Sequence, residues 1–203
     1  MFPFDVILFD VGGVLLTNGW DHRERAVVLA QFQLDVAAFE QRHMGPYDAW
    51  ERDAITAREY LDSTVFYEPR PFSHEDFFEA ILAQSVPLLD GALSILQELA
   101  ASSKCVLGVL NNEAREPNDY RLRQFRIREC IDVALSSCYV GLRKPQPAMY
   151  RRALDILGAP AERILFIDDR PENVAAASAA GMKSIQFEGA GTLRRDLEIM
   201  SLL

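Results

Sequence analysis

Short apolar runs that end abruptly in polar residues recur along this chain of 203 residues, and they constrain its fold more than any other feature. One run ends in Asp10, another in Asn111 and Asn112, and a third in the pair Asp168 and Asp169. A buried parallel strand has this pattern where it reaches the rim of its sheet. The sequence therefore predicts strands at residues 5–10, 105–110, 133–136, 163–167 and 183–187.

Segments with helical spacing separate these runs, at about 91–101, 118–129, 147–157 and 171–180. Pro171 fits the first turn of the last of them, and Gly181 fits the left-handed position after its end. Alternating strands and helices imply parallel strands joined by right-handed crossovers. The predicted fold class is α/β, a parallel Rossmann-like sheet flanked by helices.

The character of the chain changes between the first and second predicted strands. Residues 18–88 show no convincing strand and read as helices at 24–33, 36–43, 47–52, 57–63 and 74–85. This all-helical insertion predicts a cap subdomain at 18–88 and a core domain at 1–17 and 89–203. Because the insertion follows the first strand directly, we expect it to lie over any site at that strand's end.

The polar residues that follow the strands are the candidate site, because ligands of open α/β sheets bind outside the carboxyl ends of the strands. Asp10 is a candidate nucleophile or metal ligand. Repulsion between Asp168 and Asp169 would be offset by a divalent cation, and hard oxygen ligands suit Mg²⁺. Lys144, just beyond the run at 133–136, adds a positive charge that would help the site to accept a phosphate.

Each of these residues also has a purely structural explanation. Asp10 fits a turn, the acidic pair fits a loop before a helix whose dipole favours it, and Lys144 fits an exposed turn before a proline. Asn111 and Asn112 fit a simple turn as well as they fit amide donors to phosphoryl oxygens. The combination favours a site more than any single residue does.

Composition excludes several classes of protein. The net charge of −9 argues against a nucleic-acid surface, and no run reaches the apolar length of a membrane helix. Three cysteines without CxxC spacing predict reduced thiols in a cytoplasmic protein. Two sets of basic residues are expected to be ordinary surface or boundary residues. They are Arg121, Arg123, Arg126 and Arg128, taken as a solvated face, and His22, His43 and His74.

In their order, these segments resemble the four signature motifs of the haloacid dehalogenase superfamily of aspartate-nucleophile hydrolases. The motifs fall at residues 6–15, 107–112, 143–145 and 164–169, with a helical cap after the first. Within the superfamily the chain is similar to the branch that holds the amino-terminal phosphatase domain of soluble epoxide hydrolase and a bacterial sugar-1-phosphate phosphatase.

The resemblance implies a role for each motif. Asp10 would attack phosphorus and become an aspartyl phosphate, and Lys144 would steady the nucleophile and the transferred group. Asp169 would ligate Mg²⁺, with Asp168 contacting the metal directly or through water. Asn111, at the position of motif two, would bind a phosphoryl oxygen.

Two departures from the family pattern matter. Gly12 stands where the phosphatases usually have a second aspartate as general acid and base, which typically contributes about 10²–10⁴-fold. The backbone carbonyl of Gly12 would still be available to Mg²⁺, but the proton donor is missing, which predicts a preference for good leaving groups. Asn111 replaces the usual serine or threonine, which alters its reach.

The leading hypothesis is a Mg²⁺-dependent phosphatase of a small phosphorylated metabolite. The alternatives are a 2-haloacid dehalogenase and a degenerate member that binds phosphate ligands or a protein partner without turnover. A phosphorelay receiver domain uses a similar set of aspartates and a lysine, but its acidic pair precedes the phospho-accepting aspartate in the chain. Here Asp10 comes first and the acidic pair comes last, so this class is set aside. Asn18 and Trp20, just past the first motif, are the nearest candidates for substrate contact.

Overall fold

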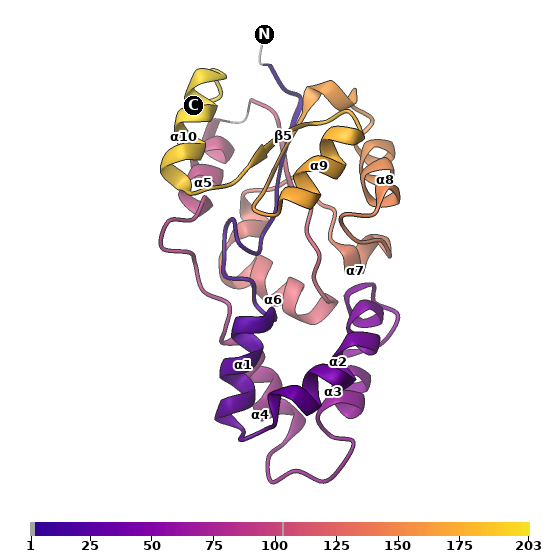
Figure 1. Cartoon of the computed structure of the whole chain (residues 1–203). Helices are drawn as coiled ribbons and strands as arrows, with labels where there is room; N and C mark the ends of the chain where they lie inside the picture. Colours follow the sequence, from indigo (N-terminus) through magenta and orange to yellow (C-terminus); the bar gives the residue numbers. More distant parts are fainter. Residues whose placement is uncertain (1–2, 103) are drawn as a thin grey trace.

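Five parallel strands form one sheet in the order β3-β2-β1-β4-β5, with helices on both faces (Figure 1). The structure is a computed structural model that describes residues 3–102 and 104–203. The strands are β1 (Val6–Phe9), β2 (Val106–Val109), β3 (Val133–Ala134), β4 (Ile164–Asp168) and β5 (Lys183–Gln186). The predicted fold class is confirmed, and each predicted strand is present.

The α-helices fall into two groups. Those of the insertion are α1 (His22–Gln31), α2 (Val36–Glu51), α3 (Ala57–Thr64) and α4 (His74–Leu82). Those around the sheet are α5 (Leu93–Ser102), α6 (Arg115–Gln124), α7 (Ser137–Val140), α8 (Pro147–Leu157), α9 (Pro171–Ala179) and α10 (Ala190–Ile199). Pro171 opens α9, and Gly181 follows it with a φ of 91°. No helix in the described part of the chain is long and apolar enough to cross a membrane.

The sheet is apolar on both faces, as a parallel sheet covered on both sides requires. All four residues of β1 are buried. Ile7 and Phe9 join an apolar cluster with residues of α5 and α10. Val6 and Leu8 point the other way, into a cluster with residues of α8 and α9. The alternation of side chains along β1 thus connects two separate cores.

Strand order brings the ends of β1 and β4 together. Phe9 is in register with Val109 on one side and with Ile167 on the other. The chain builds outward from β1 to β2 and β3, then crosses back to β4 and β5. The direction reverses between β1 and β4, and such a switch point is where open α/β sheets bind ligands. Asp10 and Asp168 follow from these two neighbouring strands.

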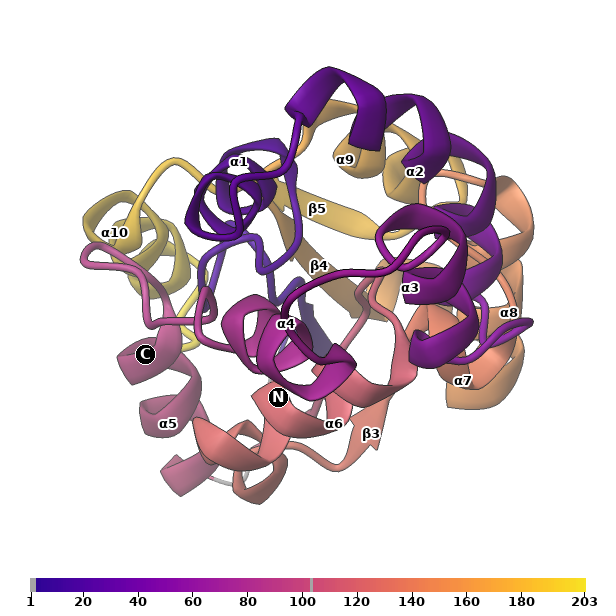
Figure 2. The ribbon, with the colours of Figure 1, turned by 90° about the horizontal axis from the view of Figure 1, so that it is seen from below.

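Helices α1 to α4, which we call the helical insertion, pack around an apolar cluster of their own. Trp20, Phe39, Trp50, Tyr60 and Phe77 lie in this cluster. The insertion lies beyond one end of the sheet in Figure 1, and seen from below its helices cross in front of the strands (Figure 2). The insertion therefore lies at the carboxyl end of the sheet, where the polar residues that follow the strands gather.

Some elements differ from the sequence prediction. The expected break between helices at 36–43 and 47–52 is wrong, because α2 runs through Pro46 without interruption. Proline removes one helical hydrogen bond, but Phe39 and Trp50 are buried on either side of it and hold the helix in place. Helix α6 ends at Gln124 instead of 129, and Arg126 takes a left-handed conformation after it. Helices α7 and α10 were not predicted.

Candidate active site

The structure brings Asp10, Asp168 and Asp169 together at the switch point. One carboxylate oxygen from each lies within 4.8 Å of the others. The backbone N–H of Asp10 donates to the carbonyl of Ile167 at 2.8 Å, which ties the end of β1 to β4. Residues that are about 160 positions apart in the chain therefore share one small volume because their strands are neighbours.

Lys144 lies between two of these carboxylates. Its Nζ is 2.9 Å from Oδ1 of Asp10 and 2.6 Å from Oδ2 of Asp168. The residue is only 4% exposed, so it is not an exposed lysine in a turn. Burial works to lower the pKa of Lys144, but the charges of Asp10 and Asp168 outweigh it and raise the pKa. The ammonium group remains charged.

Two amide side chains hold this arrangement. Asn112 accepts a hydrogen bond from the backbone N–H of Lys144 at 2.8 Å and donates to its carbonyl at 2.9 Å. Asn173 donates to both oxygens of Asp168 at 3.0 Å, and the backbone N–H of Arg170 donates to Oδ1 at 2.8 Å. Asp168 is therefore fully engaged, with its second oxygen committed to Lys144.

One carboxylate oxygen of Asp169 is still available to a ligand. Its Oδ1 is buried and has no hydrogen-bond partner among the described residues. Burial and the charge of Asp168 raise the pKa of Asp169. Gly13, with a φ of 76°, lies so close that a Cβ atom there would overlap the Asp169 carboxylate. A cluster of hard oxygen donors with one unpartnered carboxylate oxygen fits a divalent cation such as Mg²⁺.

Burial also raises the pKa of Asp10, while Lys144 works in the opposite direction. Oδ1 of Asp10 accepts a hydrogen bond from the backbone N–H of Val11 at 2.8 Å. A cation at the acidic cluster would favour the charged form further, because an opposite charge within a few ångströms stabilises a carboxylate. The charged form is the one that can act as a nucleophile.

A cavity of about 220 Å³ opens beside Asp10, between the sheet and the helical insertion. We call it the crevice. Five of the candidate residues from the sequence line it: Asp10, Gly12, Asn18, Asn112 and Lys144. Further lining residues, which the motifs did not single out as site residues, are Tyr47, Glu51, Glu113, Arg121, Arg143 and Arg170.

The structure places two of the predicted substrate contacts, Asn111 and Trp20, outside the lining of the crevice. Asn111 is 1% exposed and turns away from the crevice, donating to Asn118 at 2.9 Å and accepting from Ser136 at 2.7 Å. Trp20 is also 1% exposed, and its Nε1 donates to the Tyr60 hydroxyl at 2.8 Å inside the helical insertion. In both cases the partner comes from an element that local sequence does not reveal.

Two expected surface residues are also buried. Arg121 is 2% exposed and pairs with Glu113 at 2.5 Å, whereas Arg123, Arg126 and Arg128 are exposed as predicted. His43 is 3% exposed and lies 2.6 Å from the Tyr60 hydroxyl. The spacing of the arginines and histidines along the chain carried no sign of these partners.

Carboxylates of the helical insertion pair with arginines of the core around the crevice. Asp48 and Glu51 both pair with Arg143, the first at 2.9 Å. Away from the crevice, which neither residue lines, Asp53 pairs with Arg115 at 2.6 Å. At the start of α1, Asp21 pairs with Arg170 at 2.8 Å. These pairs hold the helical insertion over the carboxyl edge of the sheet.

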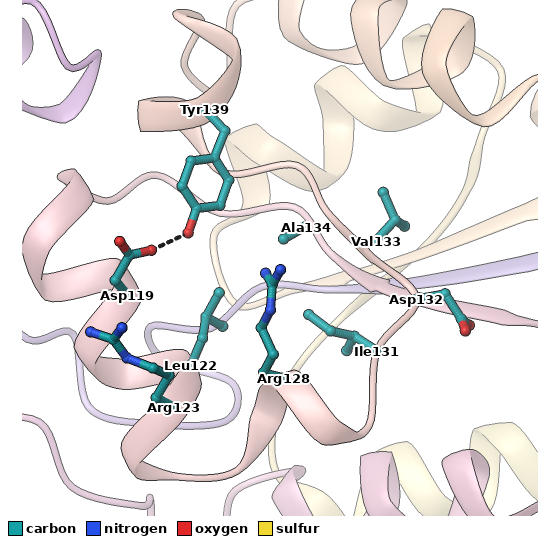
Figure 3. A pocket seen from close by; sticks show the side chains of 9 residues that line it. All are labelled: Asp119, Leu122, Arg123, Arg128, Ile131, Asp132, Val133, Ala134 and Tyr139. Atoms are coloured by element: carbon teal, nitrogen blue, oxygen red, sulfur yellow. Dashed lines mark hydrogen bonds between the residues drawn. The ribbon is translucent and has the colours of Figure 1, made fainter.

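A larger cavity, of about 640 Å³, lies at the edge strand β3 (Figure 3). Arg123, Arg128, Asp119 and Tyr139 line it, and the Tyr139 hydroxyl donates to Asp119. None of the predicted site residues lines it, so size alone does not locate the chemistry of this molecule.

A parallel sheet with an aspartate, a buried lysine and an acidic pair at its carboxyl edge defines a class, α/β proteins whose acidic site lies at the ends of parallel strands. The chain belongs to the haloacid dehalogenase-like hydrolase family, which matches residues 4–181. It is 29% identical over 187 residues to flavin mononucleotide hydrolase 1, a chloroplast protein of Arabidopsis thaliana, covering 87% of this chain and 74% of that one.

Two further comparisons agree. The chain is 26% identical over 211 residues to bifunctional epoxide hydrolase 2 of Sus scrofa, with 94% of this chain but only 38% of that protein covered. A haloacid dehalogenase family enzyme of Bacteroides thetaiotaomicron, solved with magnesium and inorganic phosphate, superposes with a TM-score of 0.77 at 20% identity. That match covers 92% of this chain and 95% of the other.

Proposed function

We propose that this hydrolase is a Mg²⁺-dependent phosphatase of a small phosphorylated metabolite. The observation that carries the proposal is that the three aspartates of the site have different partners. Lys144 pairs with both Asp10 and Asp168, while Asp169 keeps a buried oxygen without a partner among the described residues beside them. A cation would satisfy that oxygen, and Mg²⁺ is usually shared between one or two carboxylates and substrate phosphate.

In the proposed reaction a carboxylate oxygen of Asp10 attacks phosphorus, the bond to the leaving oxygen breaks, and water then hydrolyses the aspartyl phosphate. Lys144 holds Asp10 in place and faces the transferred group, and Asn112 orients Lys144 through its backbone. Asp10, Asp169 and the carbonyl of Gly12 would hold Mg²⁺, which supplies charge neutralisation for the phosphoryl oxygens. Asp168 acts chiefly through Lys144.

The names of the relatives support this chemistry. Flavin mononucleotide hydrolase acts, by its name, on a phosphate ester, and phosphoglycolate phosphatase of Rhodospirillum rubrum is 37% identical over 92 residues. We also propose that the helical insertion acts as a cap over the crevice. Three free cysteines fit a reducing compartment, and we propose the cytoplasm.

The test is a panel of phosphorylated metabolites, including flavin mononucleotide, assayed for phosphate release with and without Mg²⁺. Asp10→Asn should abolish Mg²⁺-dependent turnover. Asp53→Asn is the matched control, because Asp53 lies away from the crevice and asparagine tolerates its left-handed φ of 61°. Full activity of Asp10→Asn would refute the nucleophile. Halide release from a 2-haloacid without Mg²⁺ would favour a dehalogenase, and a trapped aspartyl phosphate without turnover would favour a binding protein.

A further inference from the structure

Position 12 carries no acid, and an amide occupies the space beside it. A Cβ atom at Gly12 would lie 3.0 Å from Oδ1 of Asn18 and 3.4 Å from its Cα. Asn18 lines the crevice with Asp10. An amide has no proton to give to a departing alkoxide at neutral pH, so any general acid must come from another part of the crevice.

Among the described residues, four carboxylates besides Asp10 line the crevice, and they differ in exposure and in how their oxygens are engaged. Asp21 caps α1 and also pairs with an arginine. Glu172 is exposed in the first turn of α9. Both oxygens of Glu113 accept hydrogen bonds, Oε2 from Arg121 at 2.5 Å and Oε1 from the next backbone N–H at 3.2 Å. The remaining carboxylate is Glu51.

Glu51 is the last residue of α2 and is 3% exposed. Its backbone carbonyl accepts a hydrogen bond from the Ser137 hydroxyl at 2.8 Å, so the end of α2 is held against the core. Oε2 of Glu51 forms an ion pair with Nε of Arg143, and the Tyr47 side chain hydrogen-bonds the same carboxylate. The carboxyl group is therefore buried and is held at the crevice by the backbone of α2, by Arg143 and by Tyr47.

We propose that Glu51 is the general acid and base of this phosphatase, the role that Gly12 cannot perform. The inference rests on the proposed function. In the first half-reaction the bond from Asp10 to phosphorus forms, the bond to the leaving oxygen breaks, and the proton of Glu51 passes to that oxygen. In the second half-reaction Glu51 takes a proton from water as the water oxygen binds phosphorus and the bond to Asp10 breaks.

The surroundings of Glu51 suit this cycle. The charged and titratable groups that face it are Tyr47, Glu113, Arg143 and Arg170. Burial raises the pKa of Glu51 to about 7, against the charge of Arg143 and with a smaller contribution from Glu113. A group that both gives and takes a proton works best when its pKa lies near the operating pH.

The test compares Glu51→Gln with Asp48→Asn. Both changes remove a carboxylate partner of Arg143 from α2, but Asp48 does not line the crevice. Steady-state rates with Mg²⁺ are measured on an alkyl phosphate and on p-nitrophenyl phosphate, whose leaving group needs no proton. The glycine at position 12 by itself predicts a preference for good leaving groups. If Glu51 supplies the proton, this preference should be absent from the wild-type enzyme and present in Glu51→Gln.

We expect Glu51→Gln to lose about 10²–10⁴-fold on the alkyl phosphate and less than about tenfold on p-nitrophenyl phosphate. The loss of rate above about pH 7 on the alkyl ester should also disappear in this variant. Asp48→Asn should change both rates by the same small factor. An equal loss on both substrates in Glu51→Gln, or no loss, would overturn the inference.

A measurement on the wild-type enzyme keeps the test independent of variant folding. Rates across a series of phosphate esters should depend only weakly on leaving-group pKa, and a steep dependence would overturn the role of Glu51. If the wild-type enzyme hydrolyses p-nitrophenyl phosphate and Asp10→Asn does not, the proposed function stands whatever Glu51 does. If no phosphate ester is hydrolysed with Mg²⁺, both proposals fail.

Discussion

Replacing His43 with asparagine should remove a pH dependence from the stability of this protein. His43 lies in α2, where its Nδ1 is 2.6 Å from the Tyr60 hydroxyl, and the same hydroxyl accepts a hydrogen bond from Nε1 of Trp20. An indole nitrogen only donates, so the single hydroxyl proton of Tyr60 points to His43. This chain of hydrogen bonds requires an unprotonated Nδ1, and we assign the neutral Nε2–H tautomer to His43 on that basis.

The size of the effect follows from the pKa. Burial, and after it the charge of Arg25, lowers the pKa of His43 from 6.5 to about 4. The unfolded chain therefore binds a proton that the folded chain refuses, so stability is complete above pH 6.5 and is lost as the pH falls toward 4. Linkage gives a loss of about 2 kcal/mol between pH of about 7.5 and about 5.

Urea unfolding at these two pH values measures the effect. The free energy of unfolding of the wild-type protein should fall by about 2 kcal/mol more than that of His43→Asn, whose Oδ1 replaces the acceptor but does not titrate. Other groups, such as Glu51, titrate alike in both proteins and cancel in the difference. His22→Asn, at an exposed side chain, is the matched control and should keep the wild-type difference. An equal fall in wild type and His43→Asn would refute the argument.

Three further predictions concern the crevice. Lys144→Met should lower the stability of the metal-free protein by about 3–5 kcal/mol, because it leaves buried carboxylates without their cation; thermal melts check this, Mg²⁺ should recover part of it, and an unchanged melting temperature would contradict it. Asn112→Ala frees the Lys144 backbone and should therefore change kcat more than KM in steady-state assays. A change in KM alone would count against this role of Asn112. Gly12→Asp with Asn18→Ala should restore alkyl phosphatase activity to Glu51→Gln, and Gly12→Asp alone should restore less, because Asn18 Oδ1 lies 3.0 Å from the new Cβ. Equal rates of the two rescued enzymes would show that Asn18 does not crowd position 12.

The parts of the site that follow directly from strand ends could be predicted from sequence. Asp10 and Asp168 each come directly after a buried apolar run, and parallel strands bring their carboxyl ends to one edge. Strand order then makes them neighbours. The backbone alone decides this placement, and the backbone is what the apolar pattern reports.

The direction in which a side chain points after a strand could not be predicted from the apolar pattern. Asn111 and Asn112 are consecutive and chemically identical, yet one turns to Asn118 and Ser136 and the other clamps Lys144. The choice depends on which partners the neighbouring elements present. Nothing in the local sequence distinguishes the two amides, so a prediction based on residue type treats them alike.

Partners from distant elements also explain the wrong surface assignments. Arg121 is close in sequence to exposed arginines, but Glu113 and the carbonyl of Thr17 lie where its side chain ends. The buried ion pair needs both partners, since an unpaired buried charge costs several kcal/mol. A cluster of basic residues in a sequence therefore contains no indication of which member will be buried.

The same reasoning applies to the contribution of the helical insertion to the site. Glu51 has no motif around it, and its partner Arg143 directly precedes Lys144 in the same loop. The ion pairs that Arg143 forms with Asp48 and Glu51 join the helical insertion to the loop that carries Lys144. Asp48 is partly exposed, and a pair of that kind contributes only about 0–1 kcal/mol. Glu51 is 3% exposed in its pair with Arg143, so this buried pair fixes the end of α2 beside the crevice more firmly than the pair of Asp48 does.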